Sequence, residues 1–266
     1  MMRGPLRTDG APNDQGLAQA RSLGTAIRAE LARARRAHGA LGWRSALARA
    51  GRGPGRALAR FLPQQHERLC GIAVGLGADW RALQLIDSAT RLEGVAFAEP
   101  GRLQAVFEVP APLAASLTLR VSQPDAGGFP SVEWTAAPLA GCLAGVSERG
   151  IAVVCCEDRC GAEPSLRFAA QELLFRASDL DGGIEHLRRR CAYLGGSGRL
   201  VAADARGDVR ELELRGGELR VREFAGPGQV TRPSVEIDCA KRRLRWHAPD
   251  GGHEAEAPEA LPERTA

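Results

Sequence analysis

The sequence predicts an α+β fold: a four-layer αββα sandwich of helix, sheet, sheet and helix, with an N-terminal helical segment. Three observations predict it. The first third of the chain has apolar residues at helical spacing, the chain after about residue 94 consists of short β-prone runs, and a pair of helices interrupts those runs. A four-layer sandwich accommodates this order economically. The 266 residues, 44% of them hydrophobic, are enough for a full hydrophobic core.

A helical segment is predicted for residues 16–93, after a flexible N-terminus at residues 1–15. Its first helix has apolar residues near helical spacing, at Leu17, Leu23, Ile27 and Leu31. The sequence GRGPGR at 51–56 ends this helix, because glycine and proline both oppose its continuation. A second, glycine-interrupted helical stretch runs from about residue 64 to residue 86. Asp79 is predicted to cap its last part, since the carboxylate can accept from the free N–H groups of a first turn.

The sandwich core is predicted for residues 94–247, packed with the helical segment as one domain. Its strands are short runs separated by turns, and they are expected at 105–109, 116–122, 132–136, 142–146, 151–156, 199–204, 209–214, 218–224, 234–239 and 241–247. Two helices are expected between the two groups of strands, the first opening near Pro164. Residues 248–266 are rich in Pro, Glu and Ala, which predicts a disordered acidic tail.

Composition narrows the class of protein. No stretch approaches the roughly 20 uncharged apolar residues that a membrane span needs, and the N-terminus has no apolar segment resembling a signal peptide. Seven cysteines without the spacing of a small disulfide scaffold favour a reducing compartment. We therefore expect a cytoplasmic protein with no membrane partner.

Basic residues concentrate near the N-terminus, where residues 1–60 carry 12 Arg against Asp9, Asp14 and Glu30. Such a helix can neutralise phosphates, so nucleic-acid binding is one alternative function. The segment lacks interleaved aromatic residues and duplex-reading motifs, however. Every basic residue of the chain except Lys241 is Arg, which is typical of a GC-rich coding sequence. A solvated helix face is the preferred interpretation, and nucleic acid is not expected as a partner.

Cys155, Cys156 and Cys160 form a closely spaced cysteine cluster. Zinc sites usually pair two close ligands with a second close pair, and the sequence has no such second pair. Cys155 and Cys156 are also adjacent on a predicted strand, so their side chains point to opposite faces. We interpret these residues as structural thiols and expect no metal ion; a redox or metal role is the alternative.

Three segments are similar to one known family. HERLCGIAVGLGADWRAL (66–83) resembles an E-L-x-G-I-A-x-G stretch, residues 119–154 resemble strand pairs that end in a G-x-N turn, and residues 195–214 resemble a G-N-x-L-x-A-D hairpin. These patterns are features of the acyl-coenzyme A:6-aminopenicillanic-acid acyltransferase family, which belongs to the N-terminal-nucleophile hydrolases with their αββα sandwich. The three matches follow family order within residues 16–225.

The resemblance implies hydrolysis of small amides, or acyl transfer from them, with no metal or organic cofactor. In such enzymes a precursor cuts itself before a Cys, Ser or Thr, and the freed α-amino group becomes the general base for that residue's side chain. An α-amine suits this role because its pKa, roughly 7.7–8.0, lies near working pH. Backbone or Asn N–H groups stabilise the tetrahedral oxyanion.

This chain departs from the family pattern at the positions that carry the chemistry. Val95 follows Gly94 where the family has its Cys nucleophile, Glu108 stands for the Asp of an N-x-D, and Ser147 stands for a turn Asn. We therefore expect an uncleaved, catalytically silent or weakened homologue that binds a small molecule or a protein partner. The short connection from Gly94 to Phe107 predicts that a piece of the nucleophile strand is missing. An active amide hydrolase or acyltransferase with an unrecognised nucleophile is the alternative.

A pocket would survive the loss of the nucleophile. The resemblance places it near Val95, Glu108, Ser147, Cys156 and Arg199. Arg199 would hold a carboxylate there by paired hydrogen bonds, which the planar guanidinium favours.

Overall fold

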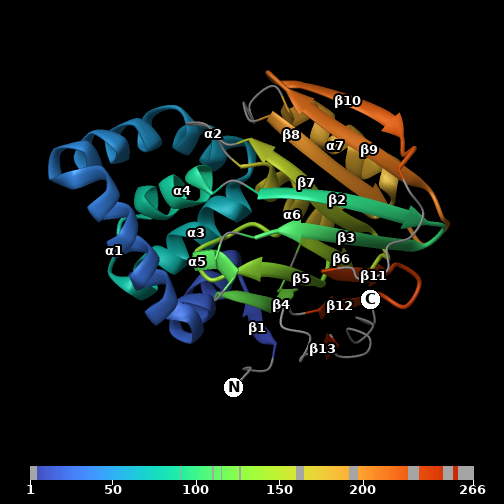
Figure 1. Cartoon of the computed structure of the whole chain (residues 1–266), viewed down its shortest axis with the longest axis horizontal. Helices are drawn as coiled ribbons and strands as arrows, with labels where there is room; N and C mark the ends of the chain where they lie inside the picture. Colours follow the sequence, from blue (N-terminus) through green and yellow to red (C-terminus); the bar gives the residue numbers. More distant parts are fainter. Residues whose placement is uncertain are drawn as a thin grey trace.

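The computed structural model describes residues 5–90, 92–109, 111–114, 116–125, 127–159, 165–191, 197–226, 234–247 and 254–256, and it has an α+β fold (Figure 1). Its helices are α1 (Pro12–Arg52), α2 (Pro54–Phe61), α3 (Pro63–Leu76), α4 (Trp80–Ala89), α5 (Ala111–Ala114), α6 (Leu166–Arg176) and α7 (Leu180–Cys191). Its strands are β1 (Leu6–Gly10), β2 (Leu92–Glu99), β3 (Arg102–Glu108), β4 (Leu117–Pro124), β5 (Ser131–Ala136), β6 (Ala144–Ser147), β7 (Ala152–Arg159), β8 (Ser197–Ala203), β9 (Val209–Arg215), β10 (Glu218–Glu223), β11 (Val235–Asp238), β12 (Arg243–His247) and β13 (Glu254–Glu256).

The strands form one hydrogen-bonded network that divides at β7 into two sheets. One edge of β7 pairs with β6 near its start and with β2 near its end, while its other edge pairs with β8. One sheet therefore runs β1-β4-β5-β6-β7-β8-β9-β10. The other leaves β7 through β2, β3, β11, β12 and β13.

Two hydrophobic cores lie on opposite faces of β7. Val153 and Cys155 belong to a core shared with the helices, whereas Val154 and Cys156 belong to a core between the two sheets. The two adjacent cysteines therefore point to opposite faces, as the strand pattern predicts. The described residues thus make a helical layer and two sheets packed face to face (Figure 1).

The helix boundaries follow local sequence signals. α1 ends at Arg52, inside the predicted break, and Gly77 ends α3 in the left-handed conformation at φ 63°. Asp79 caps α4, because its Oδ1 accepts from the backbone N–H of Arg81 at 2.9 Å; this predicted cap is confirmed. α1 also bends sharply at Gly39, whose φ of 65° and ψ of 171° are not helical.

A close helix crossing joins α1 to α3. A Cβ added at Gly16 would meet the backbone oxygen of Arg68, and one added at Gly71 would meet the backbone oxygen of Asn13. The two backbones therefore approach at a distance that only glycine permits on each side.

Each of the two terminal segments that were predicted to be flexible or disordered contains a strand. Leu6–Gly10, part of the flexible N-terminus predicted for residues 1–15, forms β1 parallel to β4. It does so because Leu6 and Thr8, on alternate positions, are buried against the core. Glu254–Glu256, in the predicted disordered tail, pairs with β12 as β13. The remaining tail residues 248–253 and 257–266, together with Pro164 and Cys160, lie outside the described residues.

β2 and β3 form a regular hairpin at the connection that is predicted to be shorter than in the family. Their register runs without a break from Glu93 opposite Glu108 to Glu99 opposite Arg102. Gly101 closes the turn with a φ of 73°. The connection is short because this turn is tight.

Within the described ranges, no single helix is long and apolar enough to cross a membrane. α3 and α4 meet the length and composition test only as a pair, and that pair is bent by 116°.

Candidate functional site

A cavity of about 310 Å³ is lined by β2, β7, β8, β9 and the end of β10. Three of the five pocket residues predicted from the sequence line it: Val95, Cys156 and Arg199. Ala96, Val201, Glu211 and residues 222–226 complete the lining. The structure thus brings together residues from strands that lie far apart in the sequence.

Val95 stands in the middle of β2 with 51% of its surface exposed. It lies opposite Val106 of β3, and Gly94 lies opposite Phe107, so the bond before Val95 belongs to a regular antiparallel ladder. A Cβ at Gly94 would meet the ring of Phe107, 2.7 Å from its Cδ1 atom. Packing against this ring accounts for the glycine at position 94.

Cys156 occupies an irregularity in β7. Its neighbours Cys155 and Glu157 pair with successive residues Leu200 and Arg199 of β8, which leaves Cys156 as the extra residue of a β-bulge. It is 1% exposed. Burial raises the pKa of its thiol to about 12, although Arg199 favours the thiolate. The thiol is therefore protonated at neutral pH and a poor nucleophile.

Arg199 supplies positive charge to the cavity. Its Nη1 lies 3.9 Å from Glu211 Oε2, and its Nε is buried with no hydrogen-bond partner among the described residues. Arg222 lines the same cavity and lies 3.6 Å from Glu213. The lining also holds Glu211 and Glu223, so its formal charges balance, and the buried Nε of Arg199 is the donor that a ligand's acceptor could use.

Glu108 and Ser147 do not line this cavity. Glu108 is exposed at the end of β3, directly opposite Glu93 of β2. Ser147 is fully buried before the turn into β7, where its backbone N–H donates to Ile151 O at 2.9 Å. Its Oγ has no hydrogen-bond partner among the described residues.

Sequence reasoning missed Glu211 and Arg222. They stand opposite each other on β9 and β10, and Glu211 also stands opposite Val201 on β8. Residues in register share a face of the sheet. Counting alternate positions from Arg199 on β8 through its pairing with β9, and from β9 to β10, would therefore have predicted Glu211 and Arg222 as pocket residues.

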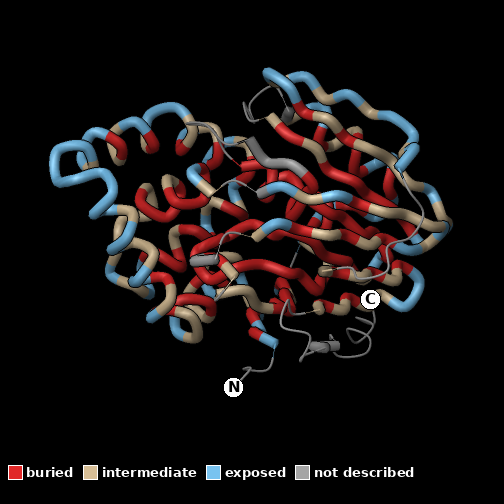
Figure 2. The backbone as a smooth tube through the Cα atoms, in the orientation of Figure 1, coloured by how far each residue is buried: buried red, intermediate tan, exposed pale blue. Residues whose placement is uncertain are grey.

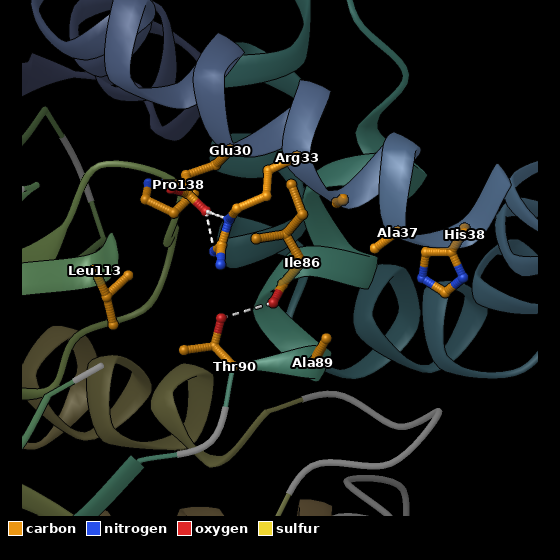
Figure 3. A pocket seen from close by; sticks show the side chains of 10 residues that line it. Glu30, Arg33, Ala37, His38, Ile86, Ala89, Thr90, Leu113 and Pro138 are labelled. Atoms are coloured by element: carbon orange, nitrogen blue, oxygen red, sulfur yellow. Dashed lines mark hydrogen bonds and ion pairs between the residues drawn. The ribbon is translucent and has the colours of Figure 1, made fainter. Parts of the chain in front are cut away.

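A second cavity, of about 410 Å³, lies between α1, α4 and α5 (Figure 3). Ile86, Leu113 and Pro138 give it an apolar floor. Arg33 donates to Glu30 from its Nε at 3.0 Å, so these two charged groups at the cavity bind each other. None of the predicted pocket residues lines this second cavity.

A buried charge cluster connects α3 to β4 and β5. Arg120 donates through its Nε to Glu133 Oε2 at 2.8 Å, and Arg68 Nη1 lies 3.7 Å from the same oxygen. Burial raises the pKa of Glu133, but Arg120 and Arg68 outweigh this effect and hold it at about 2. Burial, and then Arg120, lowers the pKa of Arg68 to about 9. The cluster lies in the interior and joins a helix to the sheet.

The described residues include no group of three or more His, Cys, Asp or Glu side chains that could hold a metal ion. In comparisons with known proteins, no protein-family model matches the chain, and no curated protein is significantly similar to it. The likeness to N-terminal-nucleophile hydrolases therefore depends on the three sequence segments alone.

Proposed function

We propose that this chain is an uncleaved, catalytically silent or weakened relative of the N-terminal-nucleophile acyltransferases, and that it binds a small molecule in the 310 Å³ cavity. One observation carries the proposal: Val95, at the position expected for the nucleophile, lines the same cavity as Arg199 and Cys156. The proposal includes the family's four-layer arrangement, of which the described residues contain a helical layer and two sheets. It also includes a cytoplasmic location, from the cysteine usage.

The loss of catalysis follows from what Val95 lacks. Its side chain has neither hydroxyl nor thiol, so it can attack no carbonyl, including that of the preceding residue. The 94–95 bond also lies in a regular ladder, which gives it none of the strain that would assist self-cleavage. Both features favour an intact chain.

The alternative is an active amide hydrolase or acyltransferase, and it needs a different nucleophile. Cys156 is the one thiol that lines the 310 Å³ cavity within the described residues. Burial keeps this thiol protonated. Cys156 also lies inside β7, so its backbone nitrogen belongs to a peptide bond and is not a free α-amine that could act as a base. These features favour the silent scaffold over the enzyme.

The mass of the purified protein tests whether the chain is cleaved. We expect one species at the full 28.3 kDa, because Val95 has no hydroxyl or thiol that could start self-cleavage. Two fragments, one of them beginning with a Cys, Ser or Thr, would overturn the proposal and favour the active enzyme.

Ligand binding tests the cavity itself. A panel of small carboxylic acids with apolar groups is added during thermal unfolding. A ligand that binds only the folded state raises Tm; at 100 times its Kd it adds about 2.7 kcal/mol to the free energy of unfolding. Arg199→Gln is expected to weaken binding roughly tenfold or more, since it removes a charged hydrogen bond. Arg215→Gln is the matched control, because Arg215 is exposed on the same sheet and does not line the cavity. Equal responses of both variants, or no stabilisation by any acid, would contradict carboxylate binding here.

A further inference from the structure

The bend of α1 forms a protrusion at one end of the molecule. In Figure 1 the long helix α1 reaches the extreme left of the view and turns back there toward α2. Gly39 makes the turn, because its φ of 65° interrupts the helix. Residues 35–42 around it are all exposed, and the corresponding stretch is pale blue in Figure 2. We call residues 35–44 the α1 tip.

The α1 tip presents apolar surface to solvent. Leu41 is 84% exposed, more than Val74 at 68% or Val95 at 51%, the other large apolar side chains that are exposed in the described ranges. Trp43, two residues farther along the helix, is half-buried: it packs against the ring of His38, with ring centroids 5.9 Å apart, and lines a cavity of about 630 Å³ between α1 and α4. An exposed leucine of this kind is costly in water and favourable at a boundary between water and lipid.

Positive charge surrounds this apolar surface. Residues 28–52 contain seven Arg and one acidic residue, Glu30. Arg33 already pairs with Glu30. Arg35, Arg36 and Arg44 are exposed and form no ion pair with an acidic side chain in the described chain. An unneutralised cluster of this kind attracts an anionic surface.

We propose that the α1 tip docks on a membrane surface that contains anionic phospholipid. Leu41 enters the headgroup region, and the three unpaired arginines contact lipid phosphates. The contact is peripheral, since Gly39 breaks the helix at its most exposed point and no described helix spans a membrane alone. It is independent of the cavity and of the function proposed for it.

Two features favour lipid over nucleic acid as the anionic partner. Leu41 projects from the tip with 84% of its surface exposed, and a phosphate backbone has no complementary apolar surface for that side chain. Reading a duplex would require a helix face laid in a groove, whereas Gly39 bends the helix away. The expectation of no membrane partner came from hydropathy, which detects spans; the exposure of Leu41 depends on the bend and is not visible in the sequence.

Vesicle co-sedimentation of the full-length protein tests the proposal. Vesicles of phosphatidylcholine are compared with vesicles that also contain phosphatidylglycerol, at low and high salt. We expect binding to the anionic vesicles, weakened by salt. The double variant Arg35→Gln, Arg36→Gln is expected to lower the partition coefficient about 30-fold, from about 1 kcal/mol for each basic residue near the surface. Leu41→Ser is expected to lower it at both salt concentrations, because it removes an apolar contact.

Matched control variants show whether vesicle binding depends on the α1 tip or on exposed charge and apolar surface anywhere in the protein. Arg215→Gln with Arg220→Gln removes two exposed arginines from the β9–β10 hairpin, and Val74→Ser removes the other strongly exposed aliphatic side chain. Neither is expected to change vesicle binding, and all variants should keep the thermal midpoint of the parent. The proposal is overturned if anionic vesicles do not bind, if the controls lower binding equally, or if nucleic acid displaces the vesicles while Leu41→Ser has no effect.

Discussion

Glu133 is almost fully buried between two arginines, and its charge compensates theirs. Arg120 donates to it directly and Arg68 lies 3.7 Å away, so this buried cluster holds two positive groups for one negative group. Breaking a buried pair costs far more than the pair contributes, because it leaves a charge without compensation. The stability of the helix-to-sheet contact therefore depends on this one carboxylate.

Glu133→Gln is expected to destabilise the protein by about 3–5 kcal/mol, since Arg120 and Arg68 would remain buried without a counter-charge. Denaturant unfolding at pH 7 measures the loss. The control is Glu236→Gln, whose partner Arg102 is 4.0 Å away on the surface; we expect it to cost about 1 kcal/mol or less. Equal losses in the two variants would contradict the compensating role of Glu133.

The pH dependence of stability follows from the same carboxyl group. The pKa of Glu133 is about 2 in the folded protein, against an ordinary value of 4.5. A depressed carboxyl pKa stabilises the folded state above the ordinary value, and this stability is lost as pH falls from about 4.5 toward 2. Unfolding measured across this range should show a smaller acid loss in Glu133→Gln than in the parent. An unchanged acid profile would place the responsible group elsewhere.

Cys156 is expected to resist alkylation in the folded protein. With a pKa of about 12, roughly one thiol in ten thousand is ionised at pH 8, and the group is also buried. Iodoacetamide labelling followed by peptide mass analysis measures this, with Val95→Cys as the exposed comparison in the same cavity. Labelling of Cys156 as fast as that of the introduced thiol would favour the catalytic alternative.

Some of these residues were predictable from the sequence and others were not. Asp79 was, because a cap depends only on its neighbours. Val95, Cys156 and Arg199 were predicted as pocket residues through the family resemblance, and they line one cavity. Ser147 was placed there too, but it lies beyond the far end of the β6–β7 pairing, a position set by strand register that a sequence pattern does not carry.

At the scale of elements, α1 and α3 cross with their backbones in close contact. Gly16 and Gly71 each face the backbone of the other helix, so no side chain separates the two. The long α1 is held to the fold along its first arm by this contact. The second arm, after Gly39, returns to the fold and buries Ala46 and Ala50, so the α1 tip projects between two anchored arms.

Gly71→Ala is expected to destabilise the protein by about 3 kcal/mol, because its Cβ would meet the backbone of Asn13 and one helix must shift. Gly53→Ala is the control: its Cβ would meet nothing within 4 Å, and its φ is −92°. That change should be neutral or stabilising by up to about 1 kcal/mol. Thermal and denaturant unfolding compare the two, and a benign Gly71→Ala would show that the helices are not in backbone contact.

Elements were easier to predict than their pairing. The β-prone runs gave most strands of the core, since alternation and turn residues are local signals. β1 was missed because five residues next to a terminus show little periodicity, and its strand character comes from pairing with β4. The predicted loss of a piece of the nucleophile strand compares this chain with the family and stays a prediction; within this chain the short connection is a regular hairpin closed at Gly101.

At the scale of the whole molecule, the helical segment and the sheets share a core. Residues of α1, α3 and α4 pack with β7, β8 and β9 in one cluster. The helical segment at 16–93 and the sandwich core at 94–247 were predicted to pack as one domain, and we expect them to unfold as one cooperative unit.

Four tryptophans report on this cooperativity. Trp43 and Trp80 lie in the helical part, whereas Trp134 and Trp246 lie in the sheets. Replacing one pair by Phe leaves fluorescence from the other part alone. We expect the two double variants to show a single transition each, with midpoints equal to those measured by circular dichroism of the same variant. Midpoints that differ between fluorescence and circular dichroism would show two independently unfolding parts.

β7 has a consequence for the motions of this protein. It is the strand where the two sheets meet, with partners on β6, β2 and β8, and cores on both of its faces. Fraying from the outer strands β1, β10 or β13 leaves these pairings intact. The amide protons of β7 are therefore expected to be among the last to exchange with solvent, and their rate measures how often the two sheets separate.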